Sequence, residues 1–330
     1  MGAVSHSWLI SAVELADQLE GSPTGTPVIL DVRWTLAGSD PQGYRDGHIP
    51  GARYVDLDHQ LAGPPGSGGR HPLPAPAALQ ECWRSGGIDD DSRVVVYDAG
   101  LGLPAARAWW LLRWSGLADV RFLDGGIAAW IWATGSIAGS IEHGEPAQPE
   151  RGSITVRPGA MPVVDIDQAA ELAATGSGVL LDARAAPRFR GEIEPLDPVA
   201  GHIPGAINLP QTDLVDAFGL FRPAAELARV FAARGVGPAG PGQAATGSAT
   251  RTRSATPTRS ATPTGSAAAT SGATAEGPGR TPPPAAASCG SGVTACHLIL
   301  AGALVGIDLA LYPGSYSQWC AAGRPVAVGP

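Results

Sequence analysis

Lysine is absent from this chain of 330 residues, so all 22 basic residues are arginine. The absence excludes Schiff-base chemistry on lysine, attachment of pyridoxal phosphate and a phosphate-binding loop that depends on lysine. A formal net charge of −8 gives no reason to expect nucleic acid or an anionic membrane as a partner. We therefore expect neither a nucleic acid nor a membrane partner.

Cysteine is scarce, and the four residues Cys82, Cys289, Cys296 and Cys320 are too scattered for a disulfide framework. No cysteine or histidine cluster has zinc-site spacing, so we expect no metal. The start of the chain lacks the basic and apolar segments of an export signal. No apolar run approaches the roughly 18 residues that cross a bilayer. We expect a reducing, cytoplasmic location, which suits a reactive thiol.

A glycine-rich loop stands out near the end of the chain. Residues Cys289 to His297 read Cys-Gly-Ser-Gly-Val-Thr-Ala-Cys-His and lead into an apolar run, Leu298 to Leu309, that we expect to be helical. Gly290 and Gly292 let successive backbone N–H groups turn inward, which makes an anion-binding concavity at a helix N-terminus. Such a field favours the thiolate, the form of cysteine that attacks. We therefore interpret Cys289 as a nucleophile rather than as a small buried apolar residue.

At this length the chain can hold two domains of ordinary size. In the first half, short apolar runs alternate with stretches of helical periodicity. The predicted strands are Val28 to Arg33, Arg93 to Tyr97 and Val120 to Leu123. The predicted helices are Ser11 to Leu19, Ala105 to Leu117 and one that follows Asp124-Gly125-Gly126 through Trp130, with a turn-rich loop from Tyr44 to Ala52. This alternation is typical of an α/β fold with a parallel sheet covered on both faces.

The second half repeats the first. Val179 to Arg184 matches Val28 to Arg33, and Gly-His-Ile-Pro-Gly-Ala occurs at both Gly47 and Gly201. The pattern indicates a tandem duplication. Aligning the halves puts Asp98 opposite Cys289, so the first half has the loop without the nucleophile. We interpret Asp98 as a turn or capping residue.

The offset between the halves locates an insert. His48 and His202 are 154 residues apart, whereas Asp98 and Cys289 are 191 apart. The extra residues fall in the stretch 237–284, which is almost wholly Gly, Ala, Ser, Thr, Pro and Arg. Without apolar anchors it is predicted to be disordered. Its arginines leave a partner-binding role open as an alternative.

The residues that precede Cys289 conflict with a strand at that place. The first half has Val94 to Tyr97 before its loop, whereas the second has Pro284-Ala285-Ala286-Ala287-Ser288. Proline removes a hydrogen-bond donor and alanine is a poor strand former. We therefore predict a weak, strained or missing central strand in the second half.

The Cys-Gly-Ser-Gly-Val-Thr-Ala loop resembles that of rhodanese-type sulfurtransferases, particularly its form in 3-mercaptopyruvate sulfurtransferases. With the two Gly-His-Ile-Pro-Gly-Ala segments, the resemblance extends to the two-domain family over most of the chain. It implies tandem rhodanese-like domains, each a mainly parallel sheet flanked by helices, with the active site between them. We assign residues 1–140 to an N-terminal domain with an inactive loop, 141–160 to a linker and 161–330 to a C-terminal catalytic domain that contains the insert 237–284.

The resemblance also implies a reaction. In the family the cysteine takes a sulfur atom, becomes a persulfide and passes the sulfur to a thiol, cyanide or protein acceptor, without a metal or organic cofactor. Thiosulfate-using members often carry two cationic residues directly after the cysteine, where this chain has Gly290 and Ser291. We therefore expect 3-mercaptopyruvate as the small-molecule donor, with thiosulfate as the alternative.

The family's site residues map onto this chain as follows. Arg188 matches the position that holds the donor's anionic end, a role that suits a planar guanidinium; the alternative is an ion pair with Glu192 or Glu194. Leu196 stands where mercaptopyruvate enzymes often carry a second arginine. A proton-handling triad would comprise Asp58, His71 and Ser291. The loop residues Gly290, Gly292, Val293 and Thr294 would bind the donor.

Other residues are interpreted as structural. His48, His202 and the pair Arg33 and Arg184 occur at equivalent places in both halves, whether or not the half has a nucleophile. Cys296 is expected to face the interior. Cys82 and Cys320 have no group of polar residues near them in the sequence, so we interpret them as structural or incidental.

Two other protein classes share features of this loop or fold. A cysteine phosphatase is disfavoured because Thr294, Ala295 and Cys296 stand where its loop-closing arginine would be. The remaining alternative is a sulfur-carrier or binding protein whose catalytic activity is impaired because its central strand is weak, strained or missing.

Overall fold

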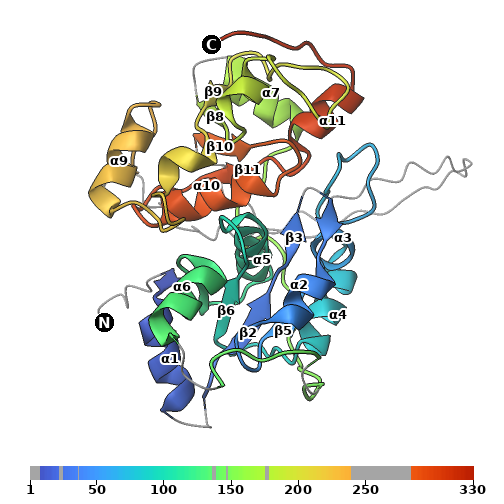
Figure 1. Ribbon diagram of the computed structural model, residues 1–330. Coiled ribbons are helices and arrows are strands. Elements are labelled where there is room, and N and C mark those ends of the chain that lie inside the picture. The colour runs from blue at the N-terminus through green and yellow to red at the C-terminus, as the bar shows by residue number, and fades with distance from the viewer. Residues whose placement is uncertain are drawn as a thin grey trace, which may run out of the picture.

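The computed structural model describes residues 8–21, 25–35, 37–135, 139–145, 148–174, 178–238 and 284–330. Within these ranges the strands form a five-stranded sheet, a four-stranded sheet and a two-stranded hairpin. Figure 1 shows the two larger sheets in separate halves of the molecule, with α5 and α10 between them. Among the helices of the described ranges, none combines the length and apolar character that crossing a bilayer requires.

The first sheet has the strand order β1-β7-β6-β2-β5, and its neighbouring strands are parallel. Its strands are β1 (Leu9–Ile10), β2 (Val28–Asp31), β5 (Arg53–Tyr54), β6 (Val94–Tyr97) and β7 (Val120–Leu123). Every residue of β6 is buried. Because side chains alternate along a strand, Val94 and Val96 join one hydrophobic cluster, while Val95 and Tyr97 join another on the opposite face. This arrangement confirms the predicted sheet covered on both faces.

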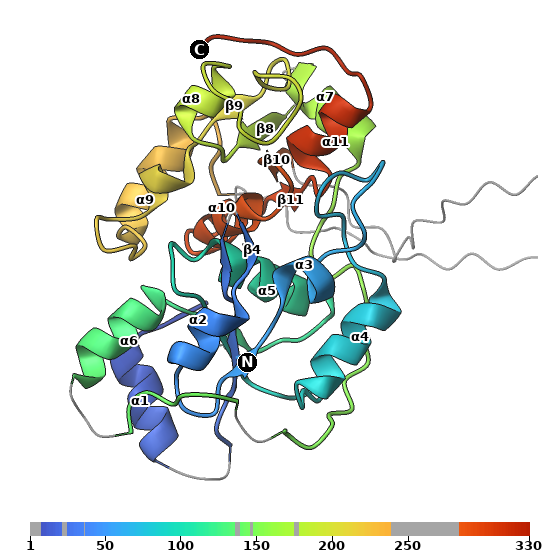
Figure 2. The ribbon, with the colours of Figure 1, turned by 45° about the vertical axis from the view of Figure 1, so that its right-hand side comes forward.

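Helices flank this sheet, and a hairpin of β3 (Trp34–Thr35) and β4 (Gly38–Ser39) stands apart from it. The helices are α1 (Ala12–Glu20), α2 (Pro41–Asp46), α3 (Leu57–Gln60), α4 (Pro76–Ser85), α5 (Leu103–Trp114) and α6 (Gly126–Thr134). Ser11 caps α1 by accepting the Glu14 N–H at 3.1 Å. Figure 2 shows α1 and α6 together at one side of the sheet, with α4 at the other.

One segment differs from the sequence prediction. The stretch from Tyr44 was predicted to be a loop, but α2 extends to Asp46. Asp40 caps this helix by accepting the Gly43 N–H at 2.8 Å, and Pro41 stands in its first turn. Proline at that position loses no hydrogen bond, because the first N–H groups of a helix have no partner within it. The residues that indicate this helix, Asp40 and Pro41, therefore lie before Tyr44, where the predicted loop begins.

The second half has the same topology. Its sheet order β11-β10-β8-β9 reproduces the order β7-β6-β2-β5 of the first sheet, and its strands are also parallel. Its elements are α7 (Ile166–Ala174), β8 (Val179–Asp182), α8 (Ala186–Phe189), β9 (Ile207–Asn208), the 3₁₀ helix η1 (Gln211–Leu214), α9 (Ala224–Ala232), β10 (Ala285–Ser288), α10 (Thr294–Ala303), β11 (Ala310–Leu311) and α11 (Ser315–Ala321). The predicted duplication is thus present in the strand order itself.

The central strand, predicted to be weak, strained or missing, is present: β10 occupies the central position and is fully buried. It pairs with β8 along its whole length and with β11 on the other side. Backbone groups make these bonds, so alanine takes part in them as fully as valine does. Pro284 precedes the strand, where its missing N–H costs nothing, and its carbonyl accepts the Val179 N–H at 2.8 Å.

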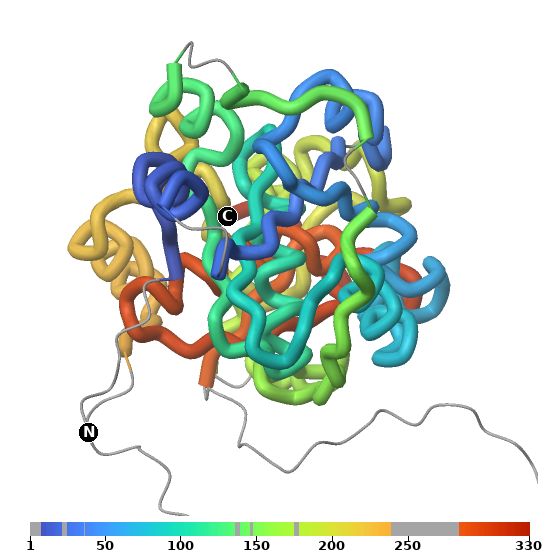
Figure 3. The backbone as a smooth tube through the Cα atoms, turned by 90° about the horizontal axis from the view of Figure 1, so that it is seen from below, coloured from blue at the N-terminus to red at the C-terminus, as the bar shows by residue number. Residues whose placement is uncertain are grey.

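Two predicted boundaries stay untested. Residues 239–283, most of the predicted insert, lie outside the described residues. The predicted linker contacts the first half, since the Ile154 N–H donates to the Ile88 carbonyl at 3.1 Å. Figure 3 shows the chain after α6 crossing the outside of the first half. The domain limits at residues 140 and 161 therefore remain predictions.

The two halves share a hydrophobic core. One cluster contains Trp109 and Leu112 of α5 together with Leu298 and Ile299 of α10. Phe122 of β7 also packs against Phe221, with ring centroids 5.7 Å apart. Burial on this scale holds the two sheets together, so residues from both halves can contribute to one site.

Candidate active site

A cavity of about 600 Å³ lies between the two halves, at the carboxyl end of β10. In open parallel sheets this edge is where ligands usually bind. Of the residues predicted for the site, the cavity wall includes Asp58, His71, Arg188, Cys289, Gly290, Ser291, Val293 and Thr294. The wall also contains Gly100 and Leu101, which belong to the inactive loop of the first half. The two equivalent loops therefore face one cavity.

Cys289 follows β10 directly and is only 2% exposed. Its sulfur accepts the Gly292 N–H at 3.1 Å, and its own N–H donates to the Ser315 hydroxyl at 3.1 Å. Gly292 has φ +80, and a Cβ there would lie 2.5 Å from the Pro313 carbonyl oxygen. This position therefore requires glycine. Gly292, predicted to bind the donor, is not part of the cavity wall and instead contacts the Cys289 sulfur.

The carbonyl groups of the loop point away from the cavity. The Tyr316 N–H donates to the Cys289 carbonyl at 3.0 Å, and the Ser317 N–H donates to the Gly290 carbonyl at 2.9 Å. A trans peptide holds its N–H opposite its C=O, so the N–H groups of Gly290 and Ser291 point the other way, into the loop. With the N-terminus of α10 beside them, these groups form a concavity of inward-pointing N–H groups, and anion binding there remains a prediction.

The equivalent loop of the first half contains an anion of its own. The Asp98 carboxylate accepts the N–H groups of Gly100, Gly102 and Ala105 at 2.8, 3.1 and 3.2 Å. Burial raises the pKa of Asp98, and these three donors oppose the rise. The Ile127 N–H donates to the Asp98 carbonyl at 3.0 Å, as Tyr316 does to Cys289. Asp98 is thus the turn residue predicted, and its carboxylate fills a concavity of the same design.

The structure brings Asp58, His71 and Ser291 into one chain of contacts across the two halves. The His71 Nδ1 lies 2.8 Å from the Ser291 Oγ, and its Nε2 lies 3.3 Å from Asp58 Oδ1. Asp58 is held in turn by the hairpin, since it accepts the Trp34 indole N–H at 2.9 Å and the Ser39 N–H at 3.1 Å. The hydrogen bond to Asp58 leaves the other ring nitrogen facing the serine hydroxyl.

His71 is buried, and burial is the main cause that lowers its pKa below the usual 6.5. The charges of Arg107 and Arg70 lower the pKa of His71 further, while the Asp58 carboxylate raises it. The neutral imidazole is therefore favoured at pH 7. In that form His71 can donate to Asp58 and accept the Ser291 O–H.

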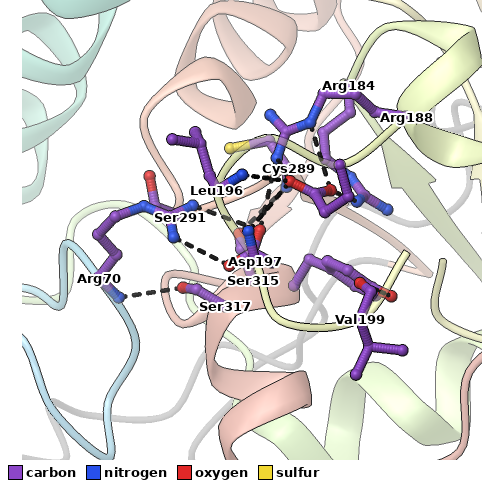
Figure 4. A network of polar contacts seen from close by, with 12 residues as sticks. Arg70, Arg184, Arg188, Leu196, Asp197, Val199, Cys289, Ser291, Ser315 and Ser317 are labelled. Carbon is purple, nitrogen blue, oxygen red and sulfur yellow. Dashed lines mark hydrogen bonds and ion pairs between the residues drawn. The ribbon is translucent and has the colours of Figure 1, made fainter. Parts of the chain in front are cut away.

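Arg188 lines the cavity and also makes the ion pair that was weighed as its alternative. Its Nη2 lies 2.5 Å from Glu194 Oε1 and 3.4 Å from Asp197 Oδ2 (Figure 4). Both carboxylates are buried, so the pair is not a surface feature. The other candidate, Glu192, pairs with Arg190 instead. The carboxylates hold the guanidinium in place, and Arg188 still faces the cavity.

Arg70 is a cavity residue that the sequence reasoning missed. It comes from the first half, and its Nη1 lies 2.9 Å from Asp197 Oδ1 (Figure 4). A Cβ on Gly290 would lie 3.3 Å from Arg70 Nη2 and 3.7 Å from Arg188 Nη1. Two guanidinium groups therefore flank Gly290, the residue after Cys289. Leu196, where a second arginine was expected, lines the same cavity. The signal that could have identified Arg70 is its position directly before His71.

The residues predicted to be structural have structural contacts. Arg184 pairs with Asp182 at 2.7 Å, as Arg33 pairs with Asp31 at 2.7 Å. His48 and His202 are buried, each with Nδ1 within 2.9 Å of a backbone carbonyl oxygen. Burial raises the pKa of Cys296 and of Cys82 to about 12, so both thiols stay protonated.

Comparison with known proteins agrees with this geometry. Residues 11–133 match the family model of the rhodanese-like domain. SseB of Mycobacterium tuberculosis, which has a provisional name as a thiosulfate sulfurtransferase, is 38% identical over 97% of each chain. The chain belongs to the rhodanese-like sulfurtransferases.

Other members of the family cover the chain as completely. A Pseudomonas aeruginosa protein with a provisional name as a 3-mercaptopyruvate sulfurtransferase is 39% identical over 99% of this rhodanese-like chain and 100% of its own. Among solved structures, SseA from Escherichia coli superposes on this chain with a TM-score of 0.68 at 28% identity. Its structure is described as the rhodanese fold of 3-mercaptopyruvate sulfotransferases. That match covers 94% of this chain and 99% of SseA.

Ser315 leads to a stability prediction, because it is the one non-glycine residue with positive φ (51°) in the described part of the chain. Its hydroxyl accepts the Cys289 N–H and donates to the Tyr312 carbonyl at 2.8 Å. Ser315→Ala removes these bonds and keeps the unfavourable φ, so it should lower the free energy of unfolding by about 1–3 kcal/mol. Ser315→Gly should cost less, because glycine adopts this φ freely. Urea denaturation measures both, and a larger loss for the glycine variant would contradict the argument.

Proposed function

We propose that this rhodanese-like sulfurtransferase takes sulfur from 3-mercaptopyruvate as a persulfide on Cys289 and passes it to a thiol, cyanide or protein acceptor. The observation that carries the proposal is the Cys289 sulfur, 3.1 Å from the Gly292 N–H in a concavity of inward-pointing amides. Such amides stabilise the anions that form at the sulfur, as an oxyanion hole does.

In the first step the Cys289 thiolate attacks the donor's sulfur. A sulfur–sulfur bond forms, the carbon–sulfur bond breaks, and the electron pair of that bond goes to the carbon as the enolate of pyruvate. The enolate takes up one proton to give pyruvate, and the enzyme retains Cys289 as a persulfide. Ser291 and His71 lie at 2.8 Å from each other beside the loop, so they can relay a solvent proton to this carbon.

In the second step the acceptor attacks the outer sulfur of the persulfide. A thiolate acceptor leaves with that sulfur as its own persulfide, and cyanide leaves as thiocyanate. The sulfur–sulfur bond breaks with its electron pair on the Cys289 sulfur, which returns to the thiolate. The Gly292 N–H then again stabilises the negative charge, so no metal or organic cofactor is required.

Donor binding is assigned to the two guanidinium groups beside Gly290. Three arginines of this cluster, Arg70, Arg184 and Arg188, stand against three carboxylates, Asp182, Glu194 and Asp197. The three positive charges equal the three negative charges, so a donor with one carboxylate changes the net charge of the cluster less than a dianion does. Planar guanidinium edges that face the cavity suit such a carboxylate.

Thiosulfate remains the second candidate donor, and Arg70 is the observation that favours it. Thiosulfate-using members often carry cationic residues after the cysteine, where this chain has Gly290 and Ser291. Arg70, the second guanidinium beside Gly290, supplies a positive charge near that place. The other alternative, an impaired sulfur-carrier or binding protein, loses its main support because β10 is formed.

Cys289→Ser tests the nucleophile. We expect the wild type to gain about 32 Da on incubation with donor, the mass of one sulfur, and the variant to gain nothing. Intact-mass spectrometry measures the gain, with Cys296→Ser as the control, because Cys296 is buried and protonated. An equal gain in Cys289→Ser would assign the sulfur to another cysteine.

Asp58→Asn tests the histidine. Asp58 raises the pKa of His71, so its loss lowers that pKa and keeps His71 neutral to lower pH. To relay a proton to the enolate, His71 has to carry a second proton, so the alkaline limb of kcat against pH should move to lower pH, while kcat itself falls about 10- to 100-fold because the ring loses its orientation. A limb that moves to higher pH would contradict the assignment.

Donor choice is tested by kcat/KM for 3-mercaptopyruvate and for thiosulfate, with cyanide as acceptor. We expect a preference for 3-mercaptopyruvate, each tenfold ratio being about 1.4 kcal/mol. Arg188→Met and Arg70→Met should each raise KM for it about 10- to 100-fold, as loss of a charged hydrogen bond does. Arg190→Met, an exposed neighbour paired with Glu192, is the matched control. A preference for thiosulfate would overturn the donor and leave the persulfide mechanism standing.

A further inference from the structure

Arg107 of α5 is a fully buried arginine that the mechanism above does not use. Its guanidinium donates to backbone carbonyls of both halves. Nη1 reaches the Gly292 carbonyl at 3.2 Å, and Nη2 reaches the carbonyls of His71 at 3.2 Å and Leu61 at 3.3 Å. The same arginine therefore touches the nucleophile's loop and the segment that carries the triad histidine.

No carboxylate of the described residues pairs with Arg107. Burying a guanidinium without a counter-charge costs several kcal/mol, and carbonyl dipoles offset only part of that cost. Stability alone is therefore a poor reason for its presence. An anion that forms nearby during the reaction would supply the missing negative charge, and Cys289 is the residue where one forms.

Gly292 is the link between Arg107 and the sulfur. Its carbonyl accepts from Arg107 and from the Cys296 thiol, whose sulfur lies 3.3 Å away. Its N–H donates to the Cys289 sulfur. With the carbonyl held on one side, the φ of +80 directs the N–H at the sulfur on the other.

The duplication gives an independent argument. The offset of 191 residues between Asp98 and Cys289 places Leu298 of α10 opposite Arg107 of α5. Arg107 thus lies on the helix that follows the inactive loop, while its hydrogen bonds reach the active loop. An arginine needed for the fold of a rhodanese-like half would be expected in both.

We propose that Arg107 is a positioning residue for sulfur transfer: it holds the Gly292 carbonyl so that the Gly292 N–H meets the Cys289 sulfur, and it holds the His71 segment against Ser291. The proposal deepens the function proposed above and rests on it. Arg107 touches neither the donor nor the sulfur, so its effect passes through these two backbone contacts and through its charge.

The test compares Arg107→Met and Arg107→Lys with Arg113→Met. Arg113 is a matched control on the same helix, because its guanidinium also donates to backbone carbonyls, those of Leu117 and Ala118, away from the cavity. The first readout is the rate of Cys289 alkylation by iodoacetamide against pH, followed on the Cys289 peptide. The second is the steady-state kinetics with 3-mercaptopyruvate and cyanide.

In Arg107→Met we expect the midpoint of the alkylation curve to rise by about one pH unit, since a nearby cation is lost. We expect kcat to fall about 100-fold with a smaller change in KM, as a displacement of reacting groups does. Arg107→Lys keeps the charge, but its single ammonium cannot reach the carbonyls of Gly292 and His71 together. Its alkylation midpoint should therefore stay near that of the wild type, while its kcat should be as low as that of Arg107→Met. Arg113→Met should leave both readouts unchanged.

Arg107→Lys with the kcat of the wild type would overturn the proposal, as would a folded Arg107→Met that behaves like Arg113→Met. If Arg107→Met does not fold, Arg107→Lys decides alone. The two proposals fail separately. A wild type that gains no sulfur, with a midpoint that still moves in Arg107→Met, would overturn the persulfide function and would still show that Arg107 acts on the Cys289 thiol.

Discussion

The packing of α5 against α10 is the contact on which the active site depends. Trp109 and Leu112 meet Leu298 and Ile299 in one buried cluster, and apolar burial of this kind is strong but has no direction. Hydrogen bonds from Arg107 to carbonyls of both halves are directional, so they fix how the two halves are oriented relative to each other. Each helix begins directly after its half's loop, so packing the helices also brings the Asp98 loop and the Cys289 loop to the same cavity.

Charge in the cavity is arranged for orientation rather than for stability. Arg188 is paired with Glu194 and Asp197, and Arg70 reaches Asp197 from the other half. Buried ion pairs of this kind contribute little net stability, because desolvation offsets most of the Coulomb attraction. They do restrict the rotamers of both guanidinium groups, so the donor carboxylate that we propose would meet N–H groups that are already oriented. A preorganised site of this kind avoids the cost of reorganising during the reaction.

The sequence predicted those parts of the molecule that depend on local chemistry. The loop at Cys289, the buried strands and the duplication are readable because glycine positions, apolar runs and repeated motifs are local signals. The strand β10 was predicted wrongly because alanine propensity was weighed without its neighbours, whereas pairing with β8 and β11 decides the matter. Arg70 and Arg107 could not be assigned from spacing, since their roles arise only when segments 127 and 185 residues apart meet.

The two halves of the duplication have diverged in a physically coherent way. Backbone N–H groups of the loop meet the Asp98 carboxylate in one half and the Cys289 sulfur in the other, so the carboxylate satisfies donors of its own loop. That loop also forms part of the wall of the shared cavity. The first half contributes Asp58 and His71 to the wall, and its Arg107 contacts the Cys289 loop. Because residues of the first half surround Cys289, both halves have to be folded and docked before the site is complete.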